Sequence, residues 1–415
     1  MDSLENALRE NQAYLCLSCG KCTAVCPISR LDAGFSPRRM VERALQDDAE
    51  EWLGGEDVWK CLTCLRCSEL CPADVRFSEF TRDLRAAARA QGDPGACTHG
   101  DAIFTWMRLM QNPDLKQNRL DWVTEDLQIS GDGDTLYFVG CLPYYDAMFG
   151  VGARHSQGSG CDCRPMTSQV TPSVENLAGN ASPLHGNALA FEGVEIAWNT
   201  VRLLNRAGIV PRLLPDERCC GHDLLWAGDY EGFHRLAELN ARMFAEAGIR
   251  RIVTACAECY RTLSMDSPGI AGVEVLHISQ VLAQAAREGR ISFDRQELPV
   301  TFHDPCRLGR HTGEYDAPRE LLSAAAQLCE MERARQRAVC CGTSVWTQCG
   351  QTAKAIQVER LGEAAARAQV LVTACPKCQI HFYCAMDDPE ADEAKKIEVR
   401  DLTTVLANAL RAVDR

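Results

Sequence analysis

The sequence predicts a multidomain protein of mixed α+β and α/β class, with a helical N-terminal domain followed by two pseudo-symmetric α/β domains. The chain has 415 residues, more than a single domain usually holds. Eight of its 24 cysteines fall in two closely spaced runs near the N-terminus. Further along, one unit occurs twice in the same order: a strand-like segment and a cysteine, then Cys-Cys-Gly, then Cys-x-x-Cys. Because internal repetition marks duplicated structural units, it divides the rest of the chain into two halves.

Composition narrows the function classes before any motif is considered. A formal net charge of −13 argues against a nucleic-acid interface, which needs a basic surface. No signal peptide is evident, and no apolar run reaches the length of a membrane span. We therefore expect a cytoplasmic protein, held at the inner membrane face only through a partner. In a reducing compartment, clustered cysteines indicate metal or redox chemistry rather than disulfides.

The first domain, residues 1–95, carries the spacing Cys-x2-Cys-x2-Cys-x3-Cys-Pro twice. This is the spacing of bacterial ferredoxins with two [4Fe-4S] cubane clusters, in which the fourth cysteine usually ligates the other cluster. The expected ligand sets are Cys16, Cys19, Cys22 with Cys71, and Cys61, Cys64, Cys67 with Cys26. Zinc ribbons or redox thiols are the alternatives, but zinc takes four ligands and suits this repeated spacing poorly.

Helix signals predict a helical rather than a β-rich ferredoxin domain. Ser36 precedes Pro37, which is an N-cap followed by proline at the first helical position. A second helix pattern covers residues 77–90. Residues 96–134 are expected to form a linker, with a short docking helix at 101–110.

From residue 135 the pattern alternates between strands and helices, as in α/β domains. Residues 135–295 are assigned to the first such domain and residues 296–415 to the second. The first is predicted to contain strand 135–139, helix 194–208, a short strand near 212–214, helix 233–248 and strand 251–254. The second repeats this order with strand 300–303, helices 318–328 and 352–367, strand 370–373, and a closing helix 401–413 capped by Asp401.

The ten cysteines of the repeat are the candidate catalytic and metal-binding residues. They are Cys141, Cys219, Cys220, Cys256, Cys259, Cys306, Cys340, Cys341, Cys375 and Cys378. The cysteines that follow strands lie at the carboxyl ends of those strands, where open α/β sheets bind ligands. Two adjacent cysteines cannot comfortably ligate one iron, so a bridging, opened cluster fits each doublet better than a cubane. Gly221 and Gly342 would let the backbone approach that cluster closely.

An insertion and six cysteines lie outside these sets. Cys141 and Cys219 are 78 positions apart, whereas Cys306 and Cys340 are 34 apart. The first copy therefore carries about 44 extra residues near 150–190, expected to form a loosely ordered surface loop. The six remaining cysteines are expected to be buried, inert thiols. They are Cys97, Cys161, Cys163, Cys329, Cys349 and Cys384.

The Cys-Cys-Gly and Cys-x-x-Cys units, with two ferredoxin runs ahead of them, resemble heterodisulfide reductase with its C subunit fused ahead of its B subunit, as in the D-type subunit. Glycolate oxidase iron–sulfur subunits and the D-type subunits of class II benzoyl-CoA reductase complexes are similar in layout. The resemblance implies that each five-cysteine set holds a non-cubane [4Fe-4S] cluster at a catalytic centre. Zinc in one of these two sites is the metal alternative, since Cys-x-x-Cys also suits zinc.

A disulfide takes two electrons, whereas an iron–sulfur cluster typically passes one, so two related clusters suit disulfide reduction. We expect electrons to pass from a flavoprotein or cytochrome b-type partner through the cubanes to the paired clusters and then to a small disulfide. The alternatives are an electron-transfer subunit of a flavin dehydrogenase, quinone-linked or electron-bifurcating complex, and a zinc-stabilised scaffold. A donor protein is required because the sequence contains no Gly-x-Gly-x-x-Gly fingerprint that opens a helix after a strand. Candidate proton donors and anion-binding residues are His222, Glu258, His303, Asp304, His311, Lys377 and Arg307.

Overall fold

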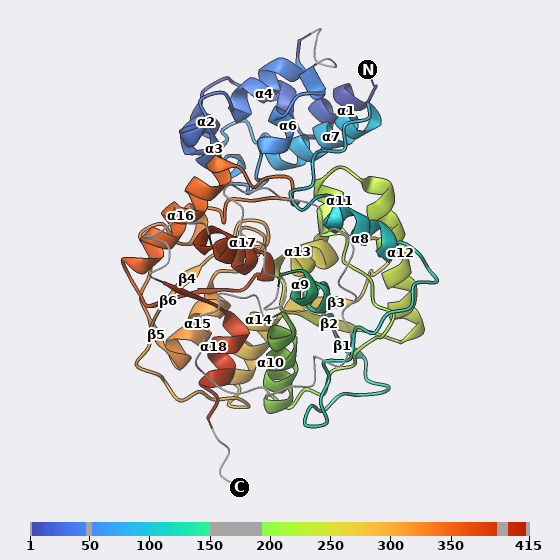
Figure 1. Cartoon of the computed structure of the whole chain (residues 1–415), viewed down its shortest axis with the longest axis vertical. Helices are drawn as coiled ribbons and strands as arrows, with labels where there is room; N and C mark the ends of the chain where they lie inside the picture. The colour runs from blue at the N-terminus through green and yellow to red at the C-terminus, as the bar shows by residue number, and fades with distance from the viewer. Residues whose placement is uncertain (1, 47–51, 150–192, 388–396, 412–415) are drawn as a thin grey trace.

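The computed structural model describes residues 2–46, 52–149, 193–387 and 397–411. A helical N-terminal domain sits on a larger body built around two parallel β-sheets (Figure 1). The predicted fold class is thus confirmed. The insertion near 150–190, with Cys161 and Cys163, lies outside the described residues.

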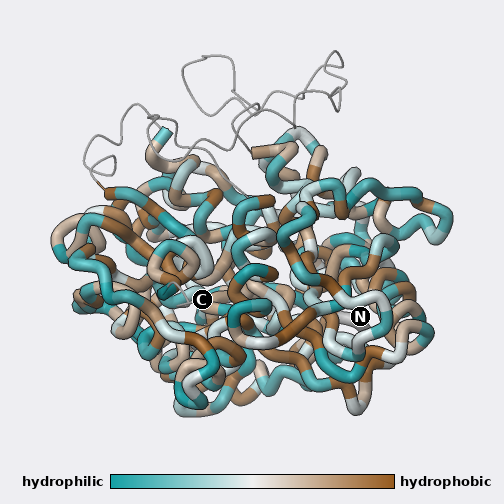
Figure 2. The backbone as a smooth tube through the Cα atoms, turned by 90° about the horizontal axis from the view of Figure 1, so that it is seen from below, coloured by the Kyte–Doolittle hydropathy of each residue, from teal (hydrophilic) through white to brown (hydrophobic). Residues whose placement is uncertain are grey.

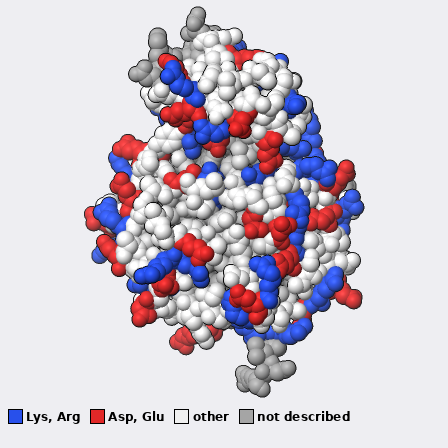
Figure 3. Space-filling model, turned by 180° about the vertical axis from the view of Figure 1, so that it is seen from behind, with Lys and Arg blue, Asp and Glu red and all other residues white. Residues whose placement is uncertain are grey.

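Hydrophobic and hydrophilic stretches alternate along the chain (Figure 2), as expected for elements that bury one face. On the face shown in Figure 3, acidic and basic side chains are interspersed. Many surface arginines pair with carboxylates, as Arg251 does with Glu274 at 2.6 Å and Arg287 with Glu320 at 2.6 Å. Each exposed pair contributes only about 0–1 kcal/mol, so the fold depends on its buried contacts instead.

The N-terminal domain packs its helices around the fully buried Phe80 and Leu84. Ser36 Oγ accepts the Arg39 N–H at 3.3 Å, and Pro37 opens the following helix, as the sequence predicts. The long helix also begins and ends where predicted. The helices are α1 (Asp2–Glu10), α2 (Lys21–Val25), α3 (Pro27–Leu31), α4 (Pro37–Ala44), α6 (Asp57–Lys60) and α7 (Phe77–Ala90), with 3-10 turns at Ala13–Leu15 and Ser68–Leu70.

The expected linker is packed against the larger body. Its helix α8 (Ala102–Met110) buries Trp106 and Met107. Farther along, the Arg119 guanidinium donates to the Gly140 carbonyl at 2.8 Å and to the Glu217 carboxylate at 2.5 Å. Both charged side chains are fully buried, so this segment helps to position the start of the first cysteine set.

The first sheet is parallel, in the order β1-β2-β3, with Leu136, Ile252 and Val275 in register. Arg212 forms only isolated bridges, to Ser130 and to Leu136, so the strand predicted near 212–214 is wrong. The segment lies between Pro211 and Pro215, and proline cannot donate to a ladder. The elements are β1 (Thr135–Tyr137), α9 (Leu142–Phe149), α10 (Gly193–Arg206), α11 (His222–Trp226), α12 (Tyr230–Glu246), β2 (Arg251–Thr254), α13 (Ala257–Met265), β3 (Glu274–His277) and α14 (Ile278–Arg287).

The second sheet is parallel, in the order β5-β4-β6-β7. The helix predicted at 318–328 ends at Ala325, because the next residues pair with β4. The closing helix is shorter than predicted, although Asp401 caps it by accepting the Thr403 N–H at 2.8 Å. The elements are β4 (Pro299–His303), α15 (Asp316–Ala325), β5 (Gln327–Leu328), a 3-10 turn (Arg335–Arg337), α16 (Gln351–Ala365), β6 (Val370–Thr373), α17 (Pro376–Met386), β7 (Glu398–Asp401) and α18 (Leu402–Asn408).

The two halves pack through exchanged helix pairs. Helix α10 of the first half packs on α18 of the second, and α14 of the first packs on α15 of the second. Helices α10 and α15 precede the second main strand of their halves, whereas α14 and α18 follow the last. Each contact therefore joins an early helix to a late one, as a pseudo-two-fold axis requires.

Candidate metal centres and redox site

The two ferredoxin loops adopt the same unusual backbone. Left-handed φ values occur at Ser18 (49°) and Gly20 (78°) in the first loop, and at Thr63 (47°) and Leu65 (63°) in the second. Such values are uncommon outside glycine and mark positions where function constrains the backbone. They curl each loop toward its own thiols, so that the Thr63 N–H donates to Cys61 Sγ at 3.3 Å.

The first ferredoxin set comes together around one cavity. Its four thiols all line this cavity, with Pro72 and Gly20 beside them. Cys19 is exposed and the other three members are half-buried. Four convergent thiols match the donor set of a cubane. The members are Cys16, Cys19, Cys22 and Cys71.

The second ferredoxin set is deeper. Cys61, Cys64 and Cys67 are buried, and Cys26 approaches them from the first loop. Burial, with smaller effects of the nearby Cys64 and Cys61 thiols, raises the pKa of Cys26 to about 12 against the opposing hydrogen bonds of Ser29. A metal that takes these thiols as thiolates would displace their protons, which couples metal binding to pH.

The ten thiols of the repeat form one continuous series of interacting neighbours. Cys141 Sγ lies 3.5 Å from Cys219 Sγ, and each later thiol interacts electrostatically with the next. The two halves run in the same order, and a contact between Cys256 and Cys375 joins them. The order in the first half is Cys141, Cys219, Cys220, Cys259, Cys256, and in the second it is Cys306, Cys340, Cys341, Cys378, Cys375.

Glycine has a different role here from the one expected. A Cβ on Gly221 would lie 2.8 Å from the Phe233 ring, and one on Gly342 would lie 2.7 Å from the Ala353 carbonyl. Both glycines are left-handed, and the side where a Cβ would stand packs against a helix, while the Gly221 N–H donates to Cys219 Sγ at 3.4 Å. A Cβ on Gly140 would lie 3.0 Å from Cys259 Sγ, so Gly140 makes the close approach.

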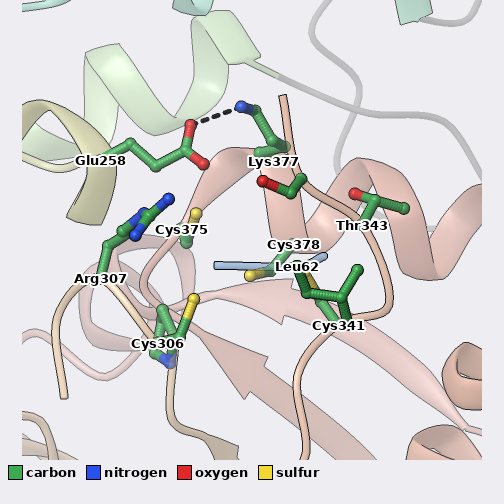
Figure 4. A pocket seen from close by; sticks show the side chains of 11 residues that line it. Leu62, Glu258, Cys306, Arg307, Cys341, Thr343, Cys375, Lys377 and Cys378 are labelled. Carbon is green, nitrogen blue, oxygen red and sulfur yellow. Dashed lines mark ion pairs between the residues drawn. The ribbon is translucent and has the colours of Figure 1, made fainter. Parts of the chain in front are cut away.

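A buried charged cluster lies at the junction of the halves (Figure 4). Glu258 and Lys377 occupy the same position in the two Cys-x-x-Cys motifs, and Lys377 Nζ lies 2.8 Å from Glu258 Oε2. The Lys377 ammonium also contacts the Asp223 carboxylate, which accepts from Trp346 Nε1 at 3.0 Å. Donor atoms of Asp223, Glu258 and His222 lie within 4.8 Å of one another, but the Lys377 ammonium already pairs with both carboxyl groups.

Protonation differs sharply between these two carboxyl groups. Burial raises the pKa of Asp223, but the Lys377 ammonium and the His222 hydrogen bond outweigh burial and hold it well below its usual range. Burial and the Asp223 charge raise the pKa of Glu258 well above its ordinary value, against the opposing effect of Lys377. Burial lowers the pKa of His222 to about 3. Two neighbouring carboxyl groups whose pKa values are shifted in opposite directions are a common arrangement for acid–base catalysis.

Arg307, in the second half of the repeat, contacts both the ferredoxin domain and the first half. Its guanidinium donates to the Thr63 carbonyl at 3.0 Å, to Thr63 Oγ1 at 2.7 Å and to His222 Nε2 at 2.9 Å. It also stacks 3.9 Å from the centre of the Trp226 ring. Nearby, Arg310 Nε donates to the Cys64 carbonyl at 2.5 Å. The second ferredoxin loop therefore rests directly on the second cysteine set.

The predicted polar residues divide into two groups. Glu258, Arg307 and Lys377 line a cavity with four thiols of the second set (Figure 4), and Leu62 of the ferredoxin loop also lines it. Asp304 instead forms a two-pronged ion pair with Arg319, at 2.7 and 2.9 Å.

The remaining histidines also act within the protein interior. His303 accepts from Arg360 Nε at 3.2 Å, and His311 Nε2 lies 2.9 Å from the Thr63 carbonyl oxygen. Burial lowers the pKa of His303 and of His311 well below the usual range, so both imidazoles are neutral at neutral pH. Asp223 and Trp226 were missed by sequence reasoning, because neither belongs to a metal-binding motif.

The donor sets fit the expected groups. Each ferredoxin set brings four thiols together, and each half of the repeat supplies five connected thiols, one more than tetrahedral zinc takes. Within the residues the structure describes, no helix is long and apolar enough to cross a bilayer.

Two known domain families match segments of this chain, in the same order as the ferredoxin domain and the two halves of the repeat. A 4Fe-4S dicluster domain matches residues 12–75, and the CCG cysteine-rich domain matches residues 190–264 and 300–383.

Among curated relatives, two are the D subunits of dihydromethanophenazine:CoB–CoM heterodisulfide reductases. That of Methanosarcina mazei is 28% identical over 72% of this chain and 65% of its own length. That of Methanosarcina barkeri is 27% identical over 95% of this chain and 93% of its own. An EtfAB:quinone oxidoreductase from Syntrophomonas wolfei is 32% identical over 51% of this chain and 31% of its own length.

Proposed function

This chain is a CCG-domain iron–sulfur oxidoreductase subunit of the heterodisulfide-reductase type, and from that premise we propose that it reduces a disulfide-type acceptor. Electrons would enter from a flavoprotein or cytochrome b-type partner at two cubane clusters held by the ferredoxin sets. They would leave through two non-cubane clusters held by the two halves of the repeat. The protein would work in the cytoplasm, at the inner membrane face only through that partner.

The observation that carries this proposal is the continuous series of ten thiols. Because Cys256 and Cys375 contact each other, the two five-thiol sets are neighbours rather than independent sites. The clusters, when bound, would supply one-electron chemistry, and two of them match the two electrons that a disulfide takes.

The residues of the chain have separate tasks around the cavity. Arg307 gives it a buried positive charge, which suits an acceptor that carries an anionic group. The Glu258 carboxyl faces the same cavity and is placed to hold a proton for a departing thiolate. The aliphatic Leu62 covers this cavity from the ferredoxin loop and helps to exclude water.

Electrons would enter the protein at the exposed end of the ferredoxin domain. Cys19 is exposed there, and Leu17 and Tyr14 beside the first set are 68% and 56% exposed. Apolar side chains around a shallow ligand suit a protein partner. Leu17→Glu is expected to slow reduction by the natural donor while leaving reduction by a small dye unchanged.

Metal analysis tests the cluster assignment first. Four clusters predict about 16 iron and 16 sulfide per chain after anaerobic purification. Zinc without the additional iron would contradict the two non-cubane sites. If the ligand sets are as assigned, the Cys71→Ala and Cys26→Ala variants should each lose a different cubane signal in electron paramagnetic resonance.

An activity assay then tests the acceptor. Oxidation of a reduced viologen dye should depend on an added disulfide, and Cys375→Ser should reduce that rate by at least 100-fold, whereas Cys329→Ser outside the sets should not change it. A fully loaded protein that oxidises no disulfide, alone or with its partner, would contradict the proposal.

The second candidate function is an electron-transfer subunit with no substrate of its own, within a flavin dehydrogenase, quinone-linked or electron-bifurcating complex. It is favoured by the similarity to the EtfAB:quinone oxidoreductase over half of this chain. Electron transfer to a quinone by the assembled complex, with no response to disulfides, would support it.

A further inference from the structure

Cys349 and Cys384 lie outside all four thiol sets, and the structure places them together. The sequence predicts both to be buried, inert thiols, but each is half-buried. Cys384 lies on α17, and Cys349 directly precedes Gly350, the N-cap of α16. Their thiols are hydrogen-bonded to each other.

A lysine completes this dithiol. Lys354, in the first turns of α16, places Nζ 2.9 Å from Cys384 Sγ and 2.6 Å from the Cys384 carbonyl oxygen. The Cys349 hydrogen bond and the Lys354 charge, with a smaller effect of His381, lower the pKa of Cys384 to about 5 against the opposing effect of burial. A thiolate beside a second thiol is the arrangement of redox-active cysteine pairs.

We infer that Cys384 and Cys349 are a redox-active dithiol, which a small-molecule disulfide oxidises to an intramolecular disulfide. The Cys384 thiolate attacks one sulfur of the small disulfide, forms a mixed disulfide and releases one thiolate. The Cys349 thiol then loses its proton to solvent and attacks Cys384 Sγ, releasing the second thiolate. Two protein thiols are oxidised by two electrons, and one small disulfide is reduced to two thiols.

The two segments that carry this dithiol also carry thiols of the second thiol set. Helix α17 has Cys375 as its N-cap and carries Cys378, and the segment that ends at Cys349 begins with Cys340 and Cys341. A bond between Cys349 and Cys384 joins these two segments covalently. The inference stands without the proposed function, because neither thiol belongs to a predicted cluster set.

Peptide mapping of the iron-loaded full chain tests the proposal, with oxidised glutathione as the probe under anaerobic conditions. We expect a linked Cys349–Cys384 peptide in the wild type and a single glutathione adduct on Cys384 in Cys349→Ser. Cys329 is the matched control, a half-buried thiol that donates to the Gln327 carbonyl at 3.7 Å. A wild type that accumulates no linked peptide, or that modifies Cys329 as fast as Cys384, would overturn it.

Alkylation by iodoacetamide adds a readout that a purely structural role would not move. A thiol with pKa near 5 should change its rate less than about twofold between pH 6 and pH 8, whereas an unperturbed thiol such as N-acetylcysteine gains about 80-fold. Lys354→Met should move the Cys384 profile toward that of the reference thiol. Parallel profiles for Cys384 and the reference in the wild type would refute the dithiol. Iron content, measured in the same samples, shows separately whether the clusters survive.

Discussion

Gly228 offers a sharp test of how the ferredoxin domain sits on the larger body. It has φ +77°, and a Cβ added there would lie 2.3 Å from the backbone nitrogen of Ala86 and 2.7 Å from the Arg85 carbonyl carbon. Both atoms belong to the backbone of α7, so no side-chain rotation can relieve the clash. Gly228→Ala should cost about 1–2 kcal/mol for the left-handed backbone and about 1–3 kcal/mol for overpacking.

Gly208 is the matched control, with φ +76° and nothing within 4 Å of an added Cβ. Gly208→Ala therefore carries only the backbone cost, and the difference between the two variants isolates the domain contact. At about 2.1 cal/mol/K per residue, each kcal/mol lowers Tm by about 1 °C in a chain of this length. Thermal unfolding, followed by circular dichroism under anaerobic conditions, should show a drop of about 2–5 °C for Gly228→Ala and about 1–2 °C for Gly208→Ala. Equal shifts would refute the close backbone approach.

Two further substitutions probe buried charges. Lys377→Met leaves the carboxylate of Asp223 and the Glu258 carboxyl without their cation. The free energy of unfolding, measured with denaturant under anaerobic conditions, should fall by about 3–5 kcal/mol. A double variant with Asp223→Asn should recover part of this loss, and strictly additive effects of the two substitutions would contradict the pairing. Burial raises the pKa of Asp401 to about 7, above the unfolded value of about 3.9. The folded protein therefore favours the protonated carboxyl, which stabilises the fold below about pH 4. This stabilisation is lost as the pH rises to about 7. Asp401→Asn should keep the Thr403 cap and remove this loss, so that the variant gains up to about 4 kcal/mol on the wild type between pH 4 and pH 8; a pH-independent difference in Tm would disprove it.

Local patterns predicted the elements well, and the failures have physical causes. Helix α7 and strands β2 and β6 have the predicted bounds, because period and flanking residues determine such elements locally. The strand expected near 212–214 is wrong because the flanking prolines leave only Arg212 to form isolated bridges. The Gly221 N–H does reach Cys219 Sγ, at 3.4 Å, but the tight contact of its missing Cβ with Phe233 is one that sequence spacing does not encode.

Among the candidate site residues, those defined by motif spacing are the ones that sequence reasoning could find. A Cys-x-x-Cys loop brings its own thiols together, so these members of each set follow from short-range geometry, whereas Cys71 and Cys141, for example, join their sets from distant positions. Which polar residues reach the cavity did not follow from the sequence. Asp304 and Glu258 both lie close to a cysteine of the repeat, yet Arg319 holds Asp304 elsewhere and only Glu258 faces the thiols.

By itself the sequence predicted the four thiol sets, the duplication and the alternation of strands and helices, because motif spacing, repetition and periodicity are properties of the chain alone. Only the tertiary structure decided that Cys256 meets Cys375, that Lys377 neutralises Asp223, and that Arg307 joins the ferredoxin loop to both halves. Each of these contacts joins residues that lie far apart in the sequence. They exist because the exchanged helix pairs α10–α18 and α14–α15 place the carboxyl ends of the two sheets against each other.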